Sequence, residues 1–559
     1  MKMRDSSVLI ATGTAFWVKM LVALLTAVLL WLAFPGGGGF WPFLFVALVP
    51  LLLAVIQTRT GRQAWFYGVL TGLCHFLVLL YWIVTVLGRY GGLPPFLSVS
   101  ALVLLALYMS LYMGFFALVA RLFFVRLPWQ IALWVIPCLW VVFDWCRSFF
   151  FTGFPWMDPG YALANVPWLI QSADVWGHYG LSYCLVLINT LLAMLFWSGG
   201  RKRGQLTWFV PVFLVCSVIA LYSSLRWQQI GRQMQVSETL RIGVVQGNIA
   251  QDLKWSSELQ QETLENYIGQ SRGLIERSHP PLLVVWPETA LPFYPAAHPL
   301  LQAMRDLTVQ GQMSLLTGAP WVEQNGGAGD GQGRPKAAGV SDGGGGQEQR
   351  RYYNSALLLD ARGQITDKYF KSHLVPFGEY VPLKNFLPFL APVVEAIGDF
   401  SPGVIQQPLA CQNARIGVLI CFESIFPEIA RKWVGVKANI LVNLTNDAWY
   451  GRSSAPYHSM AMTVLRAVET RRSLVRAANT GFSGFVDPLG RVQMVSPLFE
   501  PWAESADVVL MDEETWFVRC GYLFAPLCLG VVLVFLIWIV LRNPRSRHFT
   551  EWRVDTTNQ

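Results

Sequence analysis

Long apolar runs occupy both ends of the chain. Seven of them precede residue 226 and one lies near the C-terminus. A helix that crosses a bilayer needs roughly 20 apolar residues, so we predict eight membrane-spanning helices. The sixth run is interrupted near Gly177, which leaves the start of that span open. The predicted spans are residues 17–34, 40–56, 65–87, 97–124, 130–146, 166–197, 208–225 and 516–541.

The pattern changes between the seventh and the eighth predicted span. Short apolar runs, typical of buried strands, alternate there with stretches of helical pattern such as residues 256–277. This alternation predicts an α/β domain in which helices cover a sheet. Residues 325–350, rich in Gly, Asp and Gln, are expected to form a flexible insertion. The expected strands are residues 241–245, 282–286, 313–317, 354–360, 364–370, 416–420, 440–444 and 474–478.

Basic residues in the short connections predict the orientation in the membrane. They fall on one side if the spans alternate, and positive charge is enriched on the cytoplasmic side. Both termini are therefore expected in the cytoplasm and the polar insert outside it. We divide the chain into a seven-span domain (1–225), a catalytic domain (226–514), an eighth span (515–541) and a cytoplasmic tail (542–559). The basic residues are Lys2, Arg4, Arg59, Arg62, Arg121, Arg126, Arg201, Lys202, Arg203, Arg542, Arg545 and Arg547.

The composition supports a membrane protein and argues against a nucleic-acid partner. Hydrophobic residues make up 54% of the chain and charged residues 14%, whereas soluble proteins contain about 25% charged residues. The formal net charge of +8 arises mostly from residues between apolar segments. Nine cysteines are present, but none has the spacing of a zinc site. We expect no metal, no cofactor and no disulfide framework.

Three strand ends carry residues suited to nucleophilic catalysis. Glu288 follows an apolar strand, Lys371 leaves a strand and enters a loop shaped by Pro and Gly, and Cys421 lies where a third strand gives way to a helical stretch. A thiolate is a good nucleophile, and a nearby cation or helix N-terminus favours it; residues 424–433 are expected to supply such a helix. A carboxylate can accept protons, and a fixed ammonium can stabilise an oxyanion. Each residue alone also has an ordinary explanation as a buried cysteine, a capping carboxylate or a surface lysine.

Together these segments resemble a known enzyme superfamily. Trp286-Pro287-Glu288, Tyr369-Phe370-Lys371-Ser372-His373-Leu374 and Cys421-Phe422-Glu423 resemble the nitrilase (carbon–nitrogen hydrolase) superfamily over about residues 239–509. The whole chain is most similar to the apolipoprotein N-acyltransferases of Gram-negative bacteria. Further segments carry this closer resemblance: residues 247–248, 254–255, 353–354, 373–382 and 446–451, and Thr152-Gly153-Phe154-Pro155-Trp156.

The resemblance implies a fold and a set of site residues. The fold would be a membrane α-helical bundle of eight spans with an α/β nitrilase-like domain, an αββα sandwich. Glu288 would be the general base, Lys371 the oxyanion stabiliser and Cys421 the nucleophile. Phe422 departs from the tyrosine expected in some relatives, which puts a hydrogen bond there in doubt. Glu379 and Glu423 would support the site, and Trp255, Asn354, Phe422 and Trp449 would bind substrate or close a loop.

The implied function is transfer of a fatty acyl group from a phospholipid to the N-terminal amine of a diacylglyceryl apolipoprotein, through a thioester. The implied location is the bacterial inner membrane, with the catalytic domain in the periplasm. Two alternatives are a membrane-tethered nitrilase-type amidase and a non-catalytic multi-span scaffold or transporter. Glu288, Lys371 and Cys421 together argue against the scaffold, and eight spans exceed what a tether needs.

The sequence alone does not decide the role of three other features. Asp144 and Arg147 are spaced to pair near the end of the fifth span, whereas His178 has no evident partner. The apolar segment 383–397 is either ordinary domain core or a mobile arm that reaches into the membrane and guides acyl chains.

Overall fold

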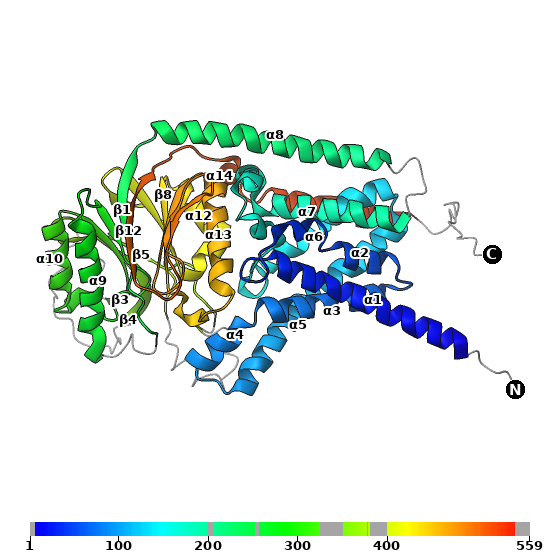
Figure 1. The fold of residues 1–559 in the computed structure, drawn as a ribbon, viewed down its shortest axis with the longest axis horizontal. Helices are drawn as coiled ribbons and strands as arrows, with labels where there is room; N and C mark the ends of the chain where they lie inside the picture. Colours follow the sequence, from blue (N-terminus) through cyan, green and yellow to red (C-terminus); the bar gives the residue numbers. More distant parts are fainter. Residues whose placement is uncertain are drawn as a thin grey trace, which may run out of the picture.

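The computed structural model describes residues 6–198, 206–251, 257–324, 350–376, 378–380 and 400–542. Four sequence predictions lie outside these residues: Trp255, the segment 383–397, the insertion except for Arg350, and the tail except for Arg542. Apolar helices form one half of the molecule and two β-sheets with their covering helices form the other (Figure 1).

Five helices in the described part of the chain are long and apolar enough to cross a membrane. A sixth candidate is a pair bent by 49°, in which α3 (Gly61–Leu79) is followed by α4 (Trp82–Thr85) and the π-helix η2 (Val86–Tyr90). The first two predicted spans correspond to shorter apolar helices. The first lies at residues 17–33 of α1 (Ser6–Ala33), and the second is formed by η1 (Trp41–Phe45) with α2 (Val49–Ile56). The count of eight spans therefore stays a prediction. The five long helices are α5 (Pro95–Arg126), α6 (Trp129–Arg147), α7 (Ala173–Ser198), α8 (Leu206–Val236) and α15 (Phe524–Leu541).

Helix α7 contains the interruption that the sequence indicated. Gly177 has φ 63° and ψ −172°, so the helical path breaks at this residue. A Cβ atom at Gly177 would lie 2.9 Å from the ring of Phe517, and its positive φ is strained for any other residue. The break frees backbone N–H groups at the start of the second half of the helix.

The half of the molecule that begins with β1 contains two six-stranded sheets. The first has the order β12-β1-β2-β3-β4-β5, and the second the order β11-β10-β9-β8-β7-β6. Strands β1, β2 and β3 are parallel to one another, as are β7, β8 and β9. The strands are β1 (Thr239–Gln246), β2 (Leu283–Val285), β3 (Ser314–Gln324), β4 (Arg350–Leu359), β5 (Ile365–Phe370), β6 (Leu409–Cys411), β7 (Ala414–Ile420), β8 (Ile440–Thr445), β9 (Ser473–Ala478), β10 (Gly484–Val486), β11 (Val492–Val495) and β12 (Trp502–Val509).

Helices pack on both sheets. Helices α9 (Gln260–Ile275) and α10 (Leu301–Gly311) share one apolar core with the first sheet. Helices α12 (Pro427–Gly435) and α13 (Ala455–Thr470) lie against the second sheet, on the side of the membrane helices (Figure 1). Helix α13 therefore lies between the catalytic sheets and the apolar bundle.

Candidate active site

The structure brings Glu288, Lys371 and Cys421 to the ends of three strands. Glu288 follows β2, Lys371 follows β5 directly, and Cys421 follows β7 directly. Strands β2 and β5 belong to the first sheet and β7 to the second, so both sheets contribute to the site. Lys371 is 1% exposed and Glu288 7%, and Cys421 is half-buried.

A buried hydrogen-bond network surrounds the Lys371 ammonium. Its Nζ lies 2.9 Å from Glu379 Oε2 and 3.8 Å from Glu288 Oε1. Asn354 Nδ2 donates to both carboxylates, at 2.8 Å to Glu288 and 2.7 Å to Glu379. The backbone N–H of Lys371 also donates to the Asn354 carbonyl oxygen at 2.9 Å. Asn354 therefore fixes both carboxylates relative to the lysine.

The pKa values of Lys371 and Cys421 are both raised. Burial opposes the charge on Lys371, but the carboxylates of Glu379 and Glu288 outweigh it and raise the pKa of the ammonium. Burial and then the negative charge of Glu288 raise the pKa of the Cys421 thiol, and Lys371 opposes them only in part. Both shifts favour a protonated lysine and a neutral thiol. The Lys371 cation favours the thiolate, as expected, but burial and the Glu288 charge outweigh it.

The turn at Cys421 also differs from the expected strand-to-helix junction. Cys421 has φ 52° and begins a short 3-10 helix, η9 (Cys421–Ile425). Phe426 is extended, and the next helix, α12, begins at Pro427 rather than at Ser424. A residue before proline is disfavoured in the α region, which explains this delay. The predicted helix N-terminus therefore does not begin beside the thiol.

Glu423 ties this turn to the loop that carries Lys371. Its carboxylate is fully buried and accepts five hydrogen bonds from two separate segments, the end of β5 with the residues after it and the end of β7. Burial raises the pKa of Glu423, while these donors and the Lys371 charge act in the opposite direction. Glu423 thus positions Cys421 relative to Lys371. The donors are Ile420 N at 2.8 Å, Ser372 N, Ser372 Oγ and Tyr369 Oη at 2.7 Å each, and His373 N at 3.1 Å.

Two of the predicted substrate-binding residues contact the membrane half of the molecule. The ring of Phe422 stacks on Phe154 with 6.1 Å between centroids. Trp449 packs edge-on against Tyr90 of η2 at 5.5 Å. Its neighbour Tyr450, which we did not predict, packs edge-on against Trp82 at 4.9 Å. The site therefore lies at the junction of the sheets and the apolar helices.

Comparison with known proteins agrees with this arrangement. A family model described as the apolipoprotein N-acyltransferase N-terminal domain matches residues 26–191, and a carbon–nitrogen hydrolase model matches residues 241–511. The apolipoprotein N-acyltransferase of Geobacter metallireducens is 38% identical, over 91% of this chain and 93% of the relative. The chain belongs to the apolipoprotein N-acyltransferase family. That of Methylococcus capsulatus is 30% identical over 92% of this chain and 95% of its own.

As a member of the apolipoprotein N-acyltransferase family, the chain is an acyltransferase and a membrane protein. Its carbon–nitrogen hydrolase domain fits acyl transfer through a cysteine. A solved amidase from Nesterenkonia sp. is 19% identical over 51% of this chain and 93% of its own, with a TM-score of 0.34, too low to bear on the fold. Family membership favours acyl transfer over the tethered amidase and the scaffold.

Proposed function

We propose that this acyltransferase moves a fatty acyl group from a phospholipid to the α-amine of the N-terminal diacylglyceryl-cysteine of an apolipoprotein, the last step of lipoprotein maturation. One observation carries the proposal. Glu288, Lys371 and Cys421 converge at the strand ends, beside residues that contact the apolar helices. A thiol in this position has access both to a lipid ester and to a lipid-anchored amine.

The first step forms a thioester. Glu288 accepts the proton of the Cys421 thiol as sulfur attacks the ester carbonyl carbon. Because the pKa of this thiol is raised, a base must take the proton during the attack. The Lys371 ammonium stabilises the negative oxygen of the tetrahedral intermediate. The C–O bond then breaks, and the leaving lysophospholipid oxygen takes the proton back from Glu288.

The second step forms the amide. The acceptor amine attacks the thioester carbonyl carbon, and Glu288 accepts the proton that this nitrogen loses. Lys371 stabilises the second oxyanion in the same way. The C–S bond breaks, and the Cys421 sulfur recovers a proton from Glu288. Two easier steps thereby replace one difficult transfer.

Asn354 and Glu379 support this chemistry. Glu379 pairs with the buried ammonium, which keeps Lys371 charged throughout the cycle. Asn354 orients the Glu288 carboxylate through a hydrogen bond of 2.8 Å. Phe422, Trp449 and Trp255 are proposed to contact substrate, and Glu423 to hold the nucleophile turn.

We further propose the membrane arrangement drawn from the loop charges. Eight spans would anchor the enzyme in the inner membrane, with residues 226–514 in the periplasm as an αββα sandwich. The five long apolar helices, the bent pair and the two shorter apolar helices supply enough elements for eight crossings. The layered packing of α9 and α10 on one sheet and of α12 and α13 on the other supports the sandwich.

Mass spectrometry of the full-length protein with phospholipid tests the proposal. We expect an acyl adduct on the Cys421 peptide and its loss when a diacylglyceryl peptide is added. The Cys421→Ser variant should form no adduct, because an alkoxide is far harder to generate than a thiolate. An adduct on another residue, or acyl transfer by the serine variant at the wild-type rate, would refute the assignment.

A further inference from the structure

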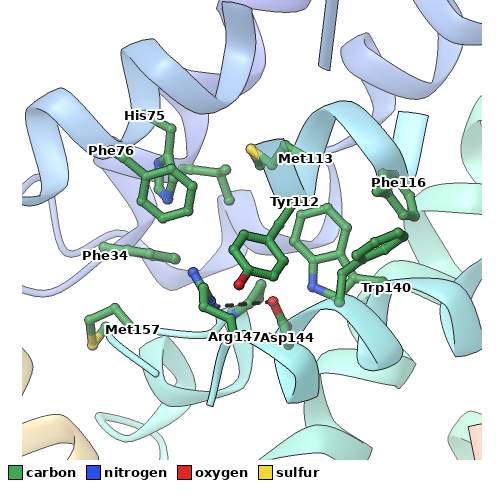
Figure 2. Close-up of a pocket in the computed structure, with 13 residues that line it drawn as sticks. Phe34, His75, Phe76, Tyr112, Met113, Phe116, Trp140, Asp144, Arg147 and Met157 are labelled. Atoms are coloured by element: carbon green, nitrogen blue, oxygen red, sulfur yellow. Dashed lines mark hydrogen bonds and ion pairs between the residues drawn. The ribbon is translucent and has the colours of Figure 1, made fainter. Parts of the chain in front are cut away.

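A chain of buried charged side chains crosses the junction between the membrane helices and the catalytic half. It begins at a cavity inside the helical bundle, where Arg147 and Asp144 lie together at 3.2 Å (Figure 2). Arg147 also pairs with Asp158. Asp158 Oδ2 lies 2.9 Å from His178 Nε2, and His178 Nδ1 lies 3.3 Å from Glu469 Oε1 of α13. The side chains of Asp158, His178 and Glu469 are fully buried.

The break at Gly177 gives Glu469 a second contact. The backbone N–H of His178 begins the second half of α7 and donates to Glu469 Oε1 at 3.0 Å. Carboxylates are favoured at helix N-termini, which carry unpaired N–H groups and the positive end of the helix dipole. A residue of the catalytic half thus caps a membrane helix.

Further polar contacts join the same helix α13 to the bundle side. Arg466 lies 3.0 Å from Glu469 and donates to the Tyr161 hydroxyl, also at 3.0 Å. One end of α13 is held by Trp156, whose indole N–H donates to His458 Nδ1 at 3.2 Å. The two ends of α13 are therefore both fixed to elements that precede the catalytic domain.

Helix α13 also packs against η9, the turn that begins with Cys421. A shift of α13 relative to the bundle would therefore move the thiol relative to the membrane.

Buried ion pairs add little net stability, because removing charges from water costs about as much as pairing returns. Apolar contacts alone would hold two faces together but permit sliding, whereas directional hydrogen bonds fix one register.

From this geometry we propose that His178, with Asp158 and Glu469, is a positioning unit that fixes α13 and the Cys421 turn relative to the membrane bundle. The inference rests on the proposed function, since it concerns access of Cys421 to a donor in a bilayer. His178 contacts no reacting atom in this account and acts only through α13.

The test uses full-length protein in vesicles of phosphatidylethanolamine and phosphatidylglycerol. Two rates are measured on the Cys421 peptide by mass spectrometry: acylation by the vesicle lipid and alkylation by soluble iodoacetamide. We expect His178→Phe to lower the acylation rate at least about 10-fold and to leave alkylation within about two-fold of wild type. His178→Gln retains an N–H donor toward Asp158 and should recover most of the acylation rate.

Tyr161→Phe is the second variant, because it removes only the hydroxyl that accepts from Arg466. It should lower acylation in the same direction by a smaller factor, and it decides the matter if His178→Phe does not fold. Wild-type acylation in both variants, an equal fall of both rates, or a glutamine variant no better than phenylalanine would overturn the proposal. Absence of acylation in the wild-type protein would instead count against the proposed function.

Discussion

Glu379, rather than Glu288, is the close partner of Lys371: its Oε2 lies 2.9 Å from the ammonium, while Glu288 Oε1 lies at 3.8 Å. The two carboxylates therefore have different roles although Asn354 bonds both. Glu379 lies closer to the buried charge, and we propose that Glu288 exchanges protons with Cys421. This division leads to the first prediction.

Glu379→Gln should make acyl transfer sensitive to alkaline pH. In the wild type the pKa of Lys371 is raised, so the ammonium stays charged as pH rises and no loss of activity from its deprotonation is expected below pH 10. Without Glu379, the charge of Glu288 opposes burial with less support, so the pKa of Lys371 falls below its wild-type value and charge is lost at lower pH. The rate of thioester formation, measured from pH 6 to 10, should fall toward the alkaline end in the variant alone.

Lys371→Met is the matched control for this prediction. It removes the ammonium at every pH and should lower the rate about 100-fold or more throughout, typical of a lost oxyanion donor. A Glu379→Gln profile parallel to that of the wild type would contradict the role assigned to Glu379.

Glu288→Gln should have opposite effects on two reactions of Cys421. Acyl transfer should fall about 100-fold or more because the proton acceptor is lost. Alkylation by iodoacetamide at pH 8 should become faster, because the negative charge of Glu288 raises the pKa of this thiol and its removal increases the thiolate fraction. Both rates are followed on the Cys421 peptide. Slower alkylation in this variant would show that Glu288 does not oppose thiolate formation.

The proposed topology predicts which surface residues are accessible from outside. Arg362 lies in an exposed turn of the catalytic half, and Arg62 lies near the start of α3. In cells with an intact inner membrane, Arg362→Cys should react with a membrane-impermeant maleimide. Arg62→Cys should react only after the inner membrane is permeabilised. The reverse pattern would invert the topology.

The sequence predicted those parts of the site that depend on local pattern. Glu288 and Cys421 each follow a short apolar run, whereas Lys371 follows a more polar strand. Such strand ends meet in an α/β fold. The Gly177 interruption was also visible as a glycine in an apolar run. The late start of α12 could have been predicted from Pro427, since proline at the first helical position displaces the preceding residue from the helix.

Other features depend on distant contacts that no local pattern contains. The sequence indicated no partner for His178, which was wrong. Glu469, 291 residues away in the chain, contacts its ring. Strand β11 was missed because it has only four residues and most of them are exposed. Similarly, the raised pKa of Cys421 arises from burial and the charge of Glu288, which the local sequence around Cys421 does not reveal.

The carboxylate of Glu423 joins the end of β7, which precedes Cys421, to the residues that follow Lys371. In the wild type the Ile420 N–H donates to Glu423 Oε2 at 2.8 Å. Glu423→Gln keeps one side-chain oxygen but places an amide NH2 group opposite this N–H. Leaving such a buried donor unsatisfied costs about 1–3 kcal/mol, so thermal unfolding should shift to lower temperature. Because Ile420 precedes Cys421, thioester formation should also fall, by about 10-fold or more.

A matched control lies on the next helix, where Glu428 pairs with Arg431 at 2.9 Å and both side chains are about one-third exposed. Glu428→Gln removes the same charge from a screened surface pair and should change the free energy of unfolding by less than about 1 kcal/mol. Its rate of thioester formation should equal that of the wild type. Equal behaviour of the two glutamine variants in both measurements would mean that Glu423 does not position the nucleophile. We expect Glu423→Gln to lose more stability than Glu428→Gln and to lose most in the rate of thioester formation. The reason is that the Glu423 carboxylate fixes Ile420 relative to Ser372.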